Sequence, residues 1–100
     1  MYKYLTENKR EYVLSKQVLR SGTAIGANIE EAIGGQSRKD FLSKISIAYK
    51  EARETGYWLR LLHDTNYLNQ KEFDSIMELS NELTRIIGKI QTTTKINSQI

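Results

Sequence analysis

The strongest constraint on the fold is an uninterrupted pattern of apolar and small residues between positions 41 and 62. These residues recur at alternating steps of four and three: Phe41, Ile45, Ala48, Ala52, Thr55, Leu59 and Leu62. Such spacing places all of them on one face of an α-helix. A helix with this kind of stripe packs along other helices at shallow crossing angles, so the pattern predicts a helical bundle.

Two further segments carry the same periodicity on either side, and the chain has no proline to interrupt them. The first is marked by Leu14, Val18, Ser21, Ile25, Ile29 and Ala32, and the second by Phe73, Ile76, Ser80, Leu83, Ile87 and Ile90. A short apolar group at the N-terminus is typical of the end of another helix. We therefore expect an all-α, antiparallel up-and-down four-helix bundle with a short first helix, forming a single domain over residues 1–100. The helices are predicted at 1–8, 11–33, 38–64 and 70–91.

Individual residues indicate where the helices end and approach one another. Ser37 is expected to cap the third helix, with the carboxylate of Asp40 in its first turn. Gly22 and Gly26 lie inside the second helix, where each costs about 1 kcal/mol relative to alanine. That cost predicts a neighbouring helix in close contact. From Thr92 onward the sequence becomes polar, so we expect the last helix to fray there.

Composition excludes several classes of protein. The chain has no cysteine, which rules out disulfides and thiolate metal sites and fits a reducing compartment. No stretch approaches the roughly 18 consecutive apolar residues of a membrane span, and the N-terminus has no signal-peptide organisation. The net charge of +3 is compatible with a nucleic-acid partner without requiring one. We expect a cytoplasmic protein with no membrane contact.

The inventory of reactive side chains argues against catalysis. His63 is the single histidine, and the residue three positions before it is Arg60, so the Glu-x-x-His pairs of di-iron bundles are absent. There is no nucleophile elbow and no phosphate-binding loop. We therefore expect no enzyme activity, no cofactor and no small-molecule substrate, and a packing or capping role for His63. Four carboxylates, Glu30, Glu31, Glu51 and Glu54, could face one another around a cation, but surface ion pairs account for them more simply, and we predict no metal site.

A second apolar sector on the third helix predicts self-association. At about 100° per residue, Ile47, Trp58 and Leu61, with Tyr57 nearby, fall outside the core stripe. Aromatic residues on a second face are typical of the core of a protein interface. The alternative is that other helices cover these side chains or that they lie singly on the surface. We interpret them as an oligomer interface.

Basic residues are dispersed along the chain, and some of them are candidates for nucleic-acid contact. Arg53 and Arg60 share one flank of the third helix with Tyr49, an arrangement compatible with phosphate contact and base stacking. The candidate contact set is Arg20, Arg38, Lys39, Arg53 and Arg60. In a monomer, a simple solvated face is the better explanation of these residues. In a symmetric oligomer, weak contacts add through avidity.

Three sequence blocks resemble a known family. The blocks are Leu19–Glu31 (LRSGTAIGANIEE), Gln36–Phe41 (QSRKDF) and Lys50–Leu62 (KEARETGYWLRLL). Together they resemble the bacterial four-helix-bundle proteins known as ribosomal-RNA intervening-sequence proteins. The polar residues at the matching positions are Arg20, Asn28, Glu31, Lys50, Glu51, Arg53 and Glu54, and no catalytic role is implied for any of them.

This resemblance implies an antiparallel four-helix bundle that assembles as a homopentamer. The family is similar in fold to the accessory proteins of diversity-generating retroelements, which bind nucleic acid, so RNA or DNA is implied as a partner beside the protein itself. The alternative is a structural protein-interaction subunit with no nucleic-acid contact. Relatives usually begin with a full first helix, whereas here only 1–8 corresponds to it. We therefore expect part of the apolar stripes on the other helices to be exposed.

Overall fold

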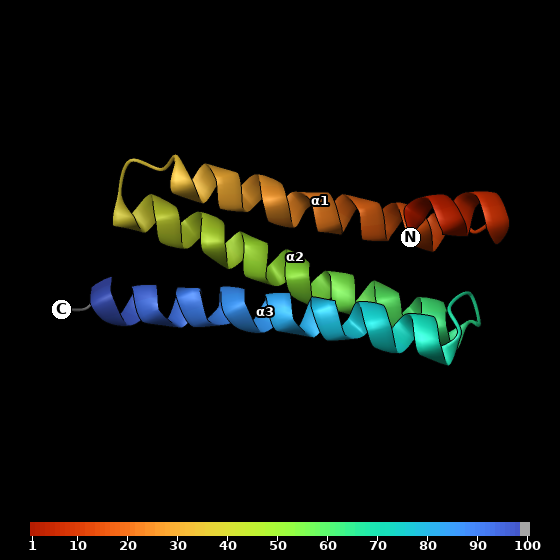
Figure 1. Ribbon diagram of the computed structural model, residues 1–100. Helices are drawn as coiled ribbons and strands as arrows, with labels where there is room; N and C mark the ends of the chain where they lie inside the picture. Colours follow the sequence, from red (N-terminus) through yellow and green to blue (C-terminus); the bar gives the residue numbers. More distant parts are fainter. Residues whose placement is uncertain (99–100) are drawn as a thin grey trace.

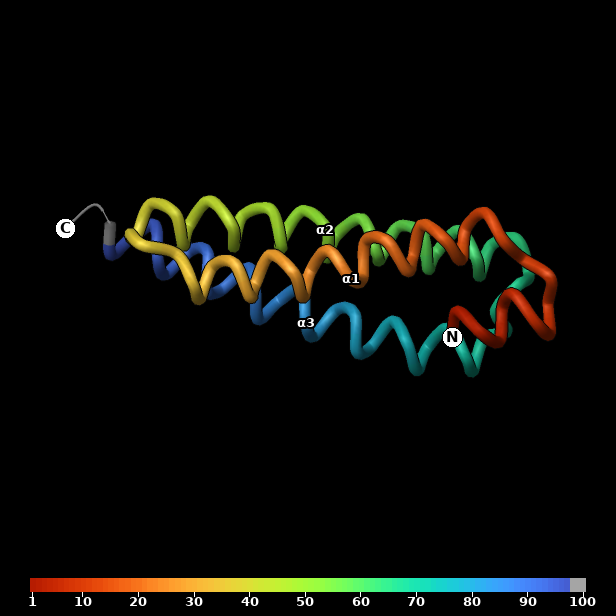
Figure 2. The backbone as a smooth tube through the Cα atoms, turned by 90° about the horizontal axis from the view of Figure 1, so that it is seen from above, coloured from red at the N-terminus to blue at the C-terminus, as the bar shows by residue number. Residues whose placement is uncertain are grey.

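The computed structural model describes residues 1–98 and consists of a short π-helical segment followed by three long helices. These elements are η1 (Tyr4–Asn8), α1 (Val13–Ile33), α2 (Arg38–Asp64) and α3 (Gln70–Ser98). Consecutive helices run in opposite directions, and α2 packs against both α1 and α3 (Figures 1 and 2). The principal extents are 50 × 20 × 14 Å, so the chain forms an elongated, shallow layer. The prediction of an all-α bundle is confirmed.

Side-chain caps set where the helices begin. Ser37 has an extended backbone, and its Oγ accepts a hydrogen bond from the backbone N of Asp40 at 3.0 Å, so the predicted cap is confirmed. Asn69 and Glu72 form a reciprocal capping box at the start of α3, at 2.8 and 2.9 Å. The carboxylate of Glu11 accepts hydrogen bonds from three backbone N–H groups, and α1 consequently begins at Val13 instead of residue 11.

The last helix is longer than predicted. We expected fraying from Thr92, but α3 continues to Ser98. The hydroxyls of Thr92 and Thr94 donate hydrogen bonds to backbone carbonyls one turn back, at 3.0 and 2.7 Å. These polar side chains are therefore hydrogen-bonded inside the helix. Arg38, at the start of α2, donates to the carbonyl of Asn97 at 3.0 Å. Sequence polarity alone did not reveal this tertiary contact.

The core consists of two apolar clusters along α2. The first surrounds Leu59 and Leu62 and includes Leu5, which is fully buried and fixes η1 to the bundle. The second surrounds Ile45 and Ala48. His63 has the predicted packing role: its ring stacks on Phe73 with centroids 4.2 Å apart. Small residues line the stripe of α2, and this allows α1 and α3 to approach it from two sides.

Candidate nucleic-acid interface

A polar groove follows the seam between α2 and α3. It consists of two adjoining open hollows of about 510 and 240 Å³, and both are bordered by Asn81 and Thr84. Its basic side chains are Arg53 and Arg60 from α2 and Arg85 and Lys89 from α3. We call this surface the seam groove. Among the described residues that line it, none is acidic.

Two glycines let the groove side chains lie close to the neighbouring backbone. A Cβ atom at Gly88 would fall 2.9 Å from Cε2 of Tyr49, so the Tyr49 ring lies directly against α3. A Cβ atom at Gly56 would fall 3.4 Å from Nη1 of Arg60. The Arg60 guanidinium therefore lies beside Gly56, one turn back on α2, and the side chain is exposed.

The cations of the seam groove have no partners within the chain. Over residues 1–98, no carboxylate forms an ion pair with Arg53, Arg60, Arg85 or Lys89, and none of the four side chains donates a hydrogen bond. Their charge is not neutralised internally. Guanidinium groups bind phosphate through a planar fork of donors, so the seam groove is suited to a polyanionic ligand.

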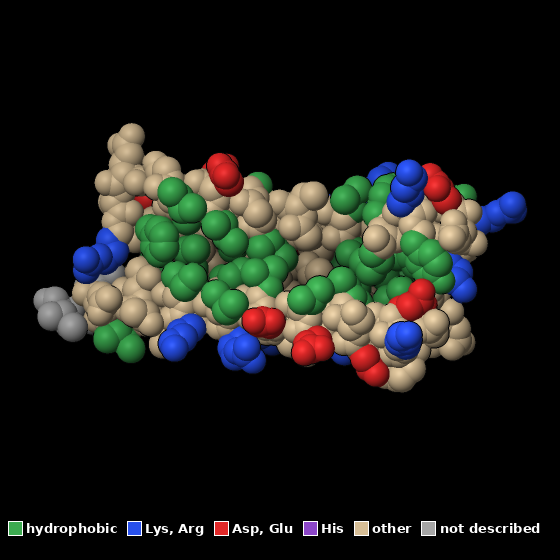
Figure 3. Space-filling model, viewed as in Figure 1, with side chains coloured by type: hydrophobic (Ala, Val, Ile, Leu, Met, Phe, Trp, Pro, Cys, Tyr) green, Lys and Arg blue, Asp and Glu red, His purple; other side chains and the backbone are tan. Residues whose placement is uncertain are grey.

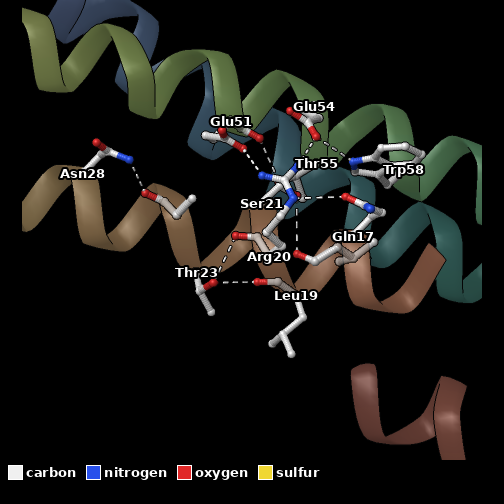
Figure 4. Close-up of polar contacts among 12 residues, drawn as sticks. Gln17, Leu19, Arg20, Ser21, Thr23, Asn28, Glu51, Glu54, Thr55 and Trp58 are labelled. Atoms are coloured by element: carbon white, nitrogen blue, oxygen red, sulfur yellow. Dashed lines mark hydrogen bonds and ion pairs between the residues drawn. The ribbon is translucent and has the colours of Figure 1, made fainter. Parts of the chain in front are cut away.

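Arg20, a predicted contact residue, lies in a different environment. Figure 4 shows its guanidinium reaching from α1 to Glu51 and Glu54 of α2, with Nη1 3.4 Å from Glu51 Oε2 and Nη2 in contact with Glu54 Oε1. Trp58 Nε1 donates to the same Glu54 oxygen at 3.1 Å. Two carboxylates therefore neutralise Arg20, and the cluster joins α1 to α2. We call it the Arg20 cluster.

The remaining predicted contacts lie elsewhere. Arg38 and Lys39 are at the first turn of α2, where Arg38 binds the end of α3 and Lys39 is exposed. The structure thus places Arg53 and Arg60 together and separates them from the other three candidates. Sequence analysis did not assign Arg85 and Lys89 to the site. Their spacing of four residues puts them on one flank of α3, but only the rotation of that helix directs the flank toward α2.

The four residues predicted to form an interface are partly accessible. Ile47 and Tyr57 are exposed, by 40% and 52%. Trp58 and Leu61 are half-buried, and the rings of Tyr57 and Trp58 meet edge to face with centroids 5.0 Å apart. Trp58 therefore belongs to the Arg20 cluster as well as to this face. Ile47, Tyr57 and Leu61 remain available for assembly.

The four carboxylates considered as a cation site do not converge. Glu51 and Glu54 bind Arg20, while Glu31 forms an ion pair with Lys44 at 2.9 Å. Over residues 1–98 no group of three or more metal-ligating side chains comes together. Within the same range, no helix combines the length and the apolar composition needed to cross a bilayer.

Comparison with known proteins assigns the family. The model of the 23S rRNA-intervening sequence protein family matches residues 1–89. The chain belongs to this family. A solved structure from Bacteroides thetaiotaomicron, a protein of unknown function from the S23 ribosomal protein family, is 49% identical, with a TM-score of 0.88. The similarity covers 91% of this chain and 81% of that one. Among curated proteins, none matches the chain.

The match supports the predicted resemblance and leaves the biochemical role open. The family model includes all three sequence blocks, and therefore both the Arg20 cluster and the α2 side of the seam groove. The solved relative is itself described as a protein of unknown function. The geometry of this chain must therefore supply any functional argument.

Proposed function

We propose that this family member is a non-enzymatic accessory protein that binds the phosphate backbone of RNA or DNA through the seam groove. The observation that supports this is the set of four cations, Arg53, Arg60, Arg85 and Lys89, with no acidic side chain among the described lining residues. Arg53 and Arg60 are seven residues apart on α2, a rise of about 10.5 Å. Cations at that spacing can contact phosphates along one strand.

The expected binding is electrostatic and has little sequence specificity. Each neutralised phosphate releases counterions, so the logarithm of the binding constant falls with the logarithm of salt concentration. Four contacts predict a slope of about −3 for single strands and about −3.6 for duplex DNA. Asn81 adds a neutral donor along the groove, which positions a backbone without reading its sequence. The Thr84 hydroxyl and the Gln91 amide instead donate within the chain, to the Ser80 carbonyl and to Ser46 Oγ.

The test is fluorescence anisotropy with labelled single-stranded RNA and duplex DNA over a series of salt concentrations. The double variant Arg53→Ala/Arg60→Ala should reduce the magnitude of the slope by about 1.5. A matched control is Arg38→Ala/Lys39→Ala, which removes the same charge from the other end of α2 and should change the slope little. Equal losses in the two double variants would show that only net charge matters, and would reject the seam groove.

We further propose that the protein acts as a cytoplasmic homo-oligomer, with the pentamer of the resembling proteins as the leading candidate. The exposed apolar side chains of Ile47 and Tyr57, beside Leu61, support this. Repetition of the seam groove around a symmetric assembly would multiply weak phosphate contacts. Leu61→Asp should lower the native mass measured by light scattering, whereas Lys50→Asp, on the same helix, should lower it less. An unchanged mass for Leu61→Asp would reject this interface.

A second candidate function is a protein-interaction subunit with no nucleic-acid contact. The exposed apolar residues favour it, because contiguous apolar surface marks interaction sites. The salt series distinguishes the two functions. Absence of RNA and DNA binding at low salt, with assembly intact, would favour the interaction subunit and would leave the seam groove as a solvated surface.

A further inference from the structure

The aromatic ring of Tyr49 lies in the seam groove and has no stacking partner. It lines the larger hollow, of about 510 Å³, together with Arg85 and Lys89 of α3. Over residues 1–98 no other ring and no cation stacks on it. Its hydroxyl forms no hydrogen bond within this range, and the side chain is only half-buried. Part of the ring and the hydroxyl are therefore available to a ligand.

Packing fixes the position of this ring before any ligand binds. One edge lies against α3, because a Cβ atom at Gly88 would fall 2.9 Å from Cε2 of Tyr49. The ring also packs against the apolar cluster that includes Ile45, Ala48 and Ile87. A side chain that is already ordered loses little conformational entropy on binding. Its remaining surface can therefore stack on a flat ligand at low cost.

The functional groups on α2 follow one line along the seam groove. Tyr49, Arg53 and Arg60 are separated by four and seven residues, so they share one flank of the helix. From Tyr49 to Arg60 the helix rises about 16.5 Å, which corresponds to roughly five nucleotides of a stacked strand at about 3.4 Å each. Because α3 runs antiparallel to α2, Arg85 and Lys89 lie at the Tyr49 end (Figures 1 and 2). One strand can thus contact the ring and the cations together.

Asn81 places a neutral polar group between the two hollows. It lines both of them, is exposed, and its side chain forms no hydrogen bond over residues 1–98. A side-chain amide both donates and accepts, so it can bond the edge of an unpaired base. In a duplex the Watson–Crick edge is already used by the opposite base.

A duplex can use the cations of this groove but not its ring. The axes of packed helices are about 8–10 Å apart, whereas the major groove of DNA alone is about 12 Å wide. A double helix would therefore rest on the rim of the seam groove. Its bases are paired and stacked on one another, and a base reaches Tyr49 only by flipping out of the stack. The bases of a single strand are free to turn into the hollow and stack on an aromatic side chain.

We infer that the seam groove selects single-stranded nucleic acid over duplex, with an unpaired base stacked on Tyr49 and neighbouring phosphates bound by Arg53, Arg60 and Arg85. This inference rests on the proposed function and names its ligand more closely. The recognised chemistry is a flat base beside a phosphate. Single strands of RNA and DNA share this chemistry, because neither contact involves the 2′-hydroxyl.

Phosphate contact alone and base stacking predict opposite preferences. Duplex DNA releases more counterions per contact, with a slope of about −0.9 against about −0.7 for single strands, so electrostatics alone favours the duplex. Fluorescence anisotropy compares 12-nucleotide dT and rU strands with a 12-base-pair dA·dT duplex. We expect at least threefold tighter binding of the single strands at about 150 mM salt, and the tighter of the two identifies DNA or RNA as the source. Equal or tighter binding of the duplex would overturn the inference and leave the phosphate contact intact.

Variants of Tyr49 separate stacking from phosphate contact. Tyr49→Ala should weaken the single strands about 5- to 150-fold, the equivalent of one stacked base, and should change duplex binding by less than twofold. Tyr49→Leu, which keeps the apolar packing without the flat ring, should behave in the same way, whereas Tyr49→Phe should retain the affinity. Tyr12→Ala removes an exposed tyrosine before α1 and is the matched control, with no expected change. Equal losses for single strands and duplex in Tyr49→Ala would reject stacking.

An abasic strand tests the role of the base directly. A 12-nucleotide strand without bases keeps its phosphates, so it should bind the wild-type chain at least fivefold more weakly than dT. Tyr49→Ala should not weaken it further, whereas Arg53→Ala/Arg60→Ala should weaken both strands. If the abasic strand binds as tightly as dT, the inference fails and the electrostatic proposal survives. If no nucleic acid binds even at low salt, the proposed function fails and the inference fails with it.

Discussion

Gly22 and Gly26 give a quantitative test of whether this face of α1 lacks a neighbouring helix in the isolated chain. A Cβ atom at either position would meet no side chain and no other helix within 4 Å. Alanine in place of glycine inside a helix is worth about 0.8–1.0 kcal/mol when the methyl group has room. We expect Gly22→Ala and Gly26→Ala each to raise the free energy of unfolding by about 1 kcal/mol. The corresponding rise in Tm is roughly 4–8 °C for a domain of this size.

Gly88→Ala is the matched control. It has the same gain in helix propensity, but there is no room for the added methyl group. Its Cβ atom would fall 2.9 Å from Cε2 of Tyr49. Overpacking typically costs about 1–3 kcal/mol, so Gly88→Ala should be between neutral and about 2 kcal/mol less stable. Urea denaturation followed by circular dichroism measures all three variants, at one fixed protein concentration because assembly also contributes to apparent stability.

The result that would refute this reasoning is destabilisation by Gly22→Ala or Gly26→Ala. Such a loss would mean that another helix already packs against α1 in solution, through assembly or through another segment.

Three other substitutions test separate parts of the fold by the same denaturation assay. Leu5→Ala should cost about 2–5 kcal/mol, because Leu5 is fully buried, whereas the half-exposed Leu19→Ala should cost much less; similar losses would show that η1 is not fixed as described. Arg20→Ala should cost about 1–2 kcal/mol by leaving the Glu51 and Glu54 carboxylates without their cation, and the cost should shrink in high salt. Nucleic-acid affinity should change less in Arg20→Ala than in the Arg53→Ala/Arg60→Ala variant. Ser37→Ala should cost about 1 kcal/mol, and Ser37→Asp should retain the cap; a loss in both would contradict the capping role.

Local sequence signals fixed most of the helical framework. The stripe from Phe41 to Leu62 predicted α2, and Ser37 predicted its first turn. These features depend on contacts within a few residues, so periodicity and capping chemistry are sufficient to find them. The end of α3 was missed because the contact of Arg38 with Asn97 joins residues that are far apart in sequence.

The candidate sites depended much more on tertiary structure. The sequence grouped Arg20 with Arg53 and Arg60, since all are basic residues on helices. Helix packing then neutralised Arg20 with two carboxylates and left Arg53 and Arg60 without ion pairs, in the hollow that adjoins the one lined by Arg85. Side-chain type identifies a charge, but only the rotation and pairing of helices decide whether that charge is neutralised or available.

The same physical reason explains the apolar hollow between α1 and α3, on the face shown in Figure 3. By itself, the sequence determined that the chain forms long amphipathic helices and that some apolar surface is left over. Its prediction of a closely packed helix at Gly22 and Gly26 is wrong for residues 1–98, because a Cβ atom at either position would meet no side chain and no other helix within 4 Å. Only the tertiary structure decided where that surface gathers. Each helix has more apolar faces than α2 can cover, because a helix bordering two neighbours needs two stripes. The arrangement of α1 and α3 on α2 brings the uncovered stripes together into one groove.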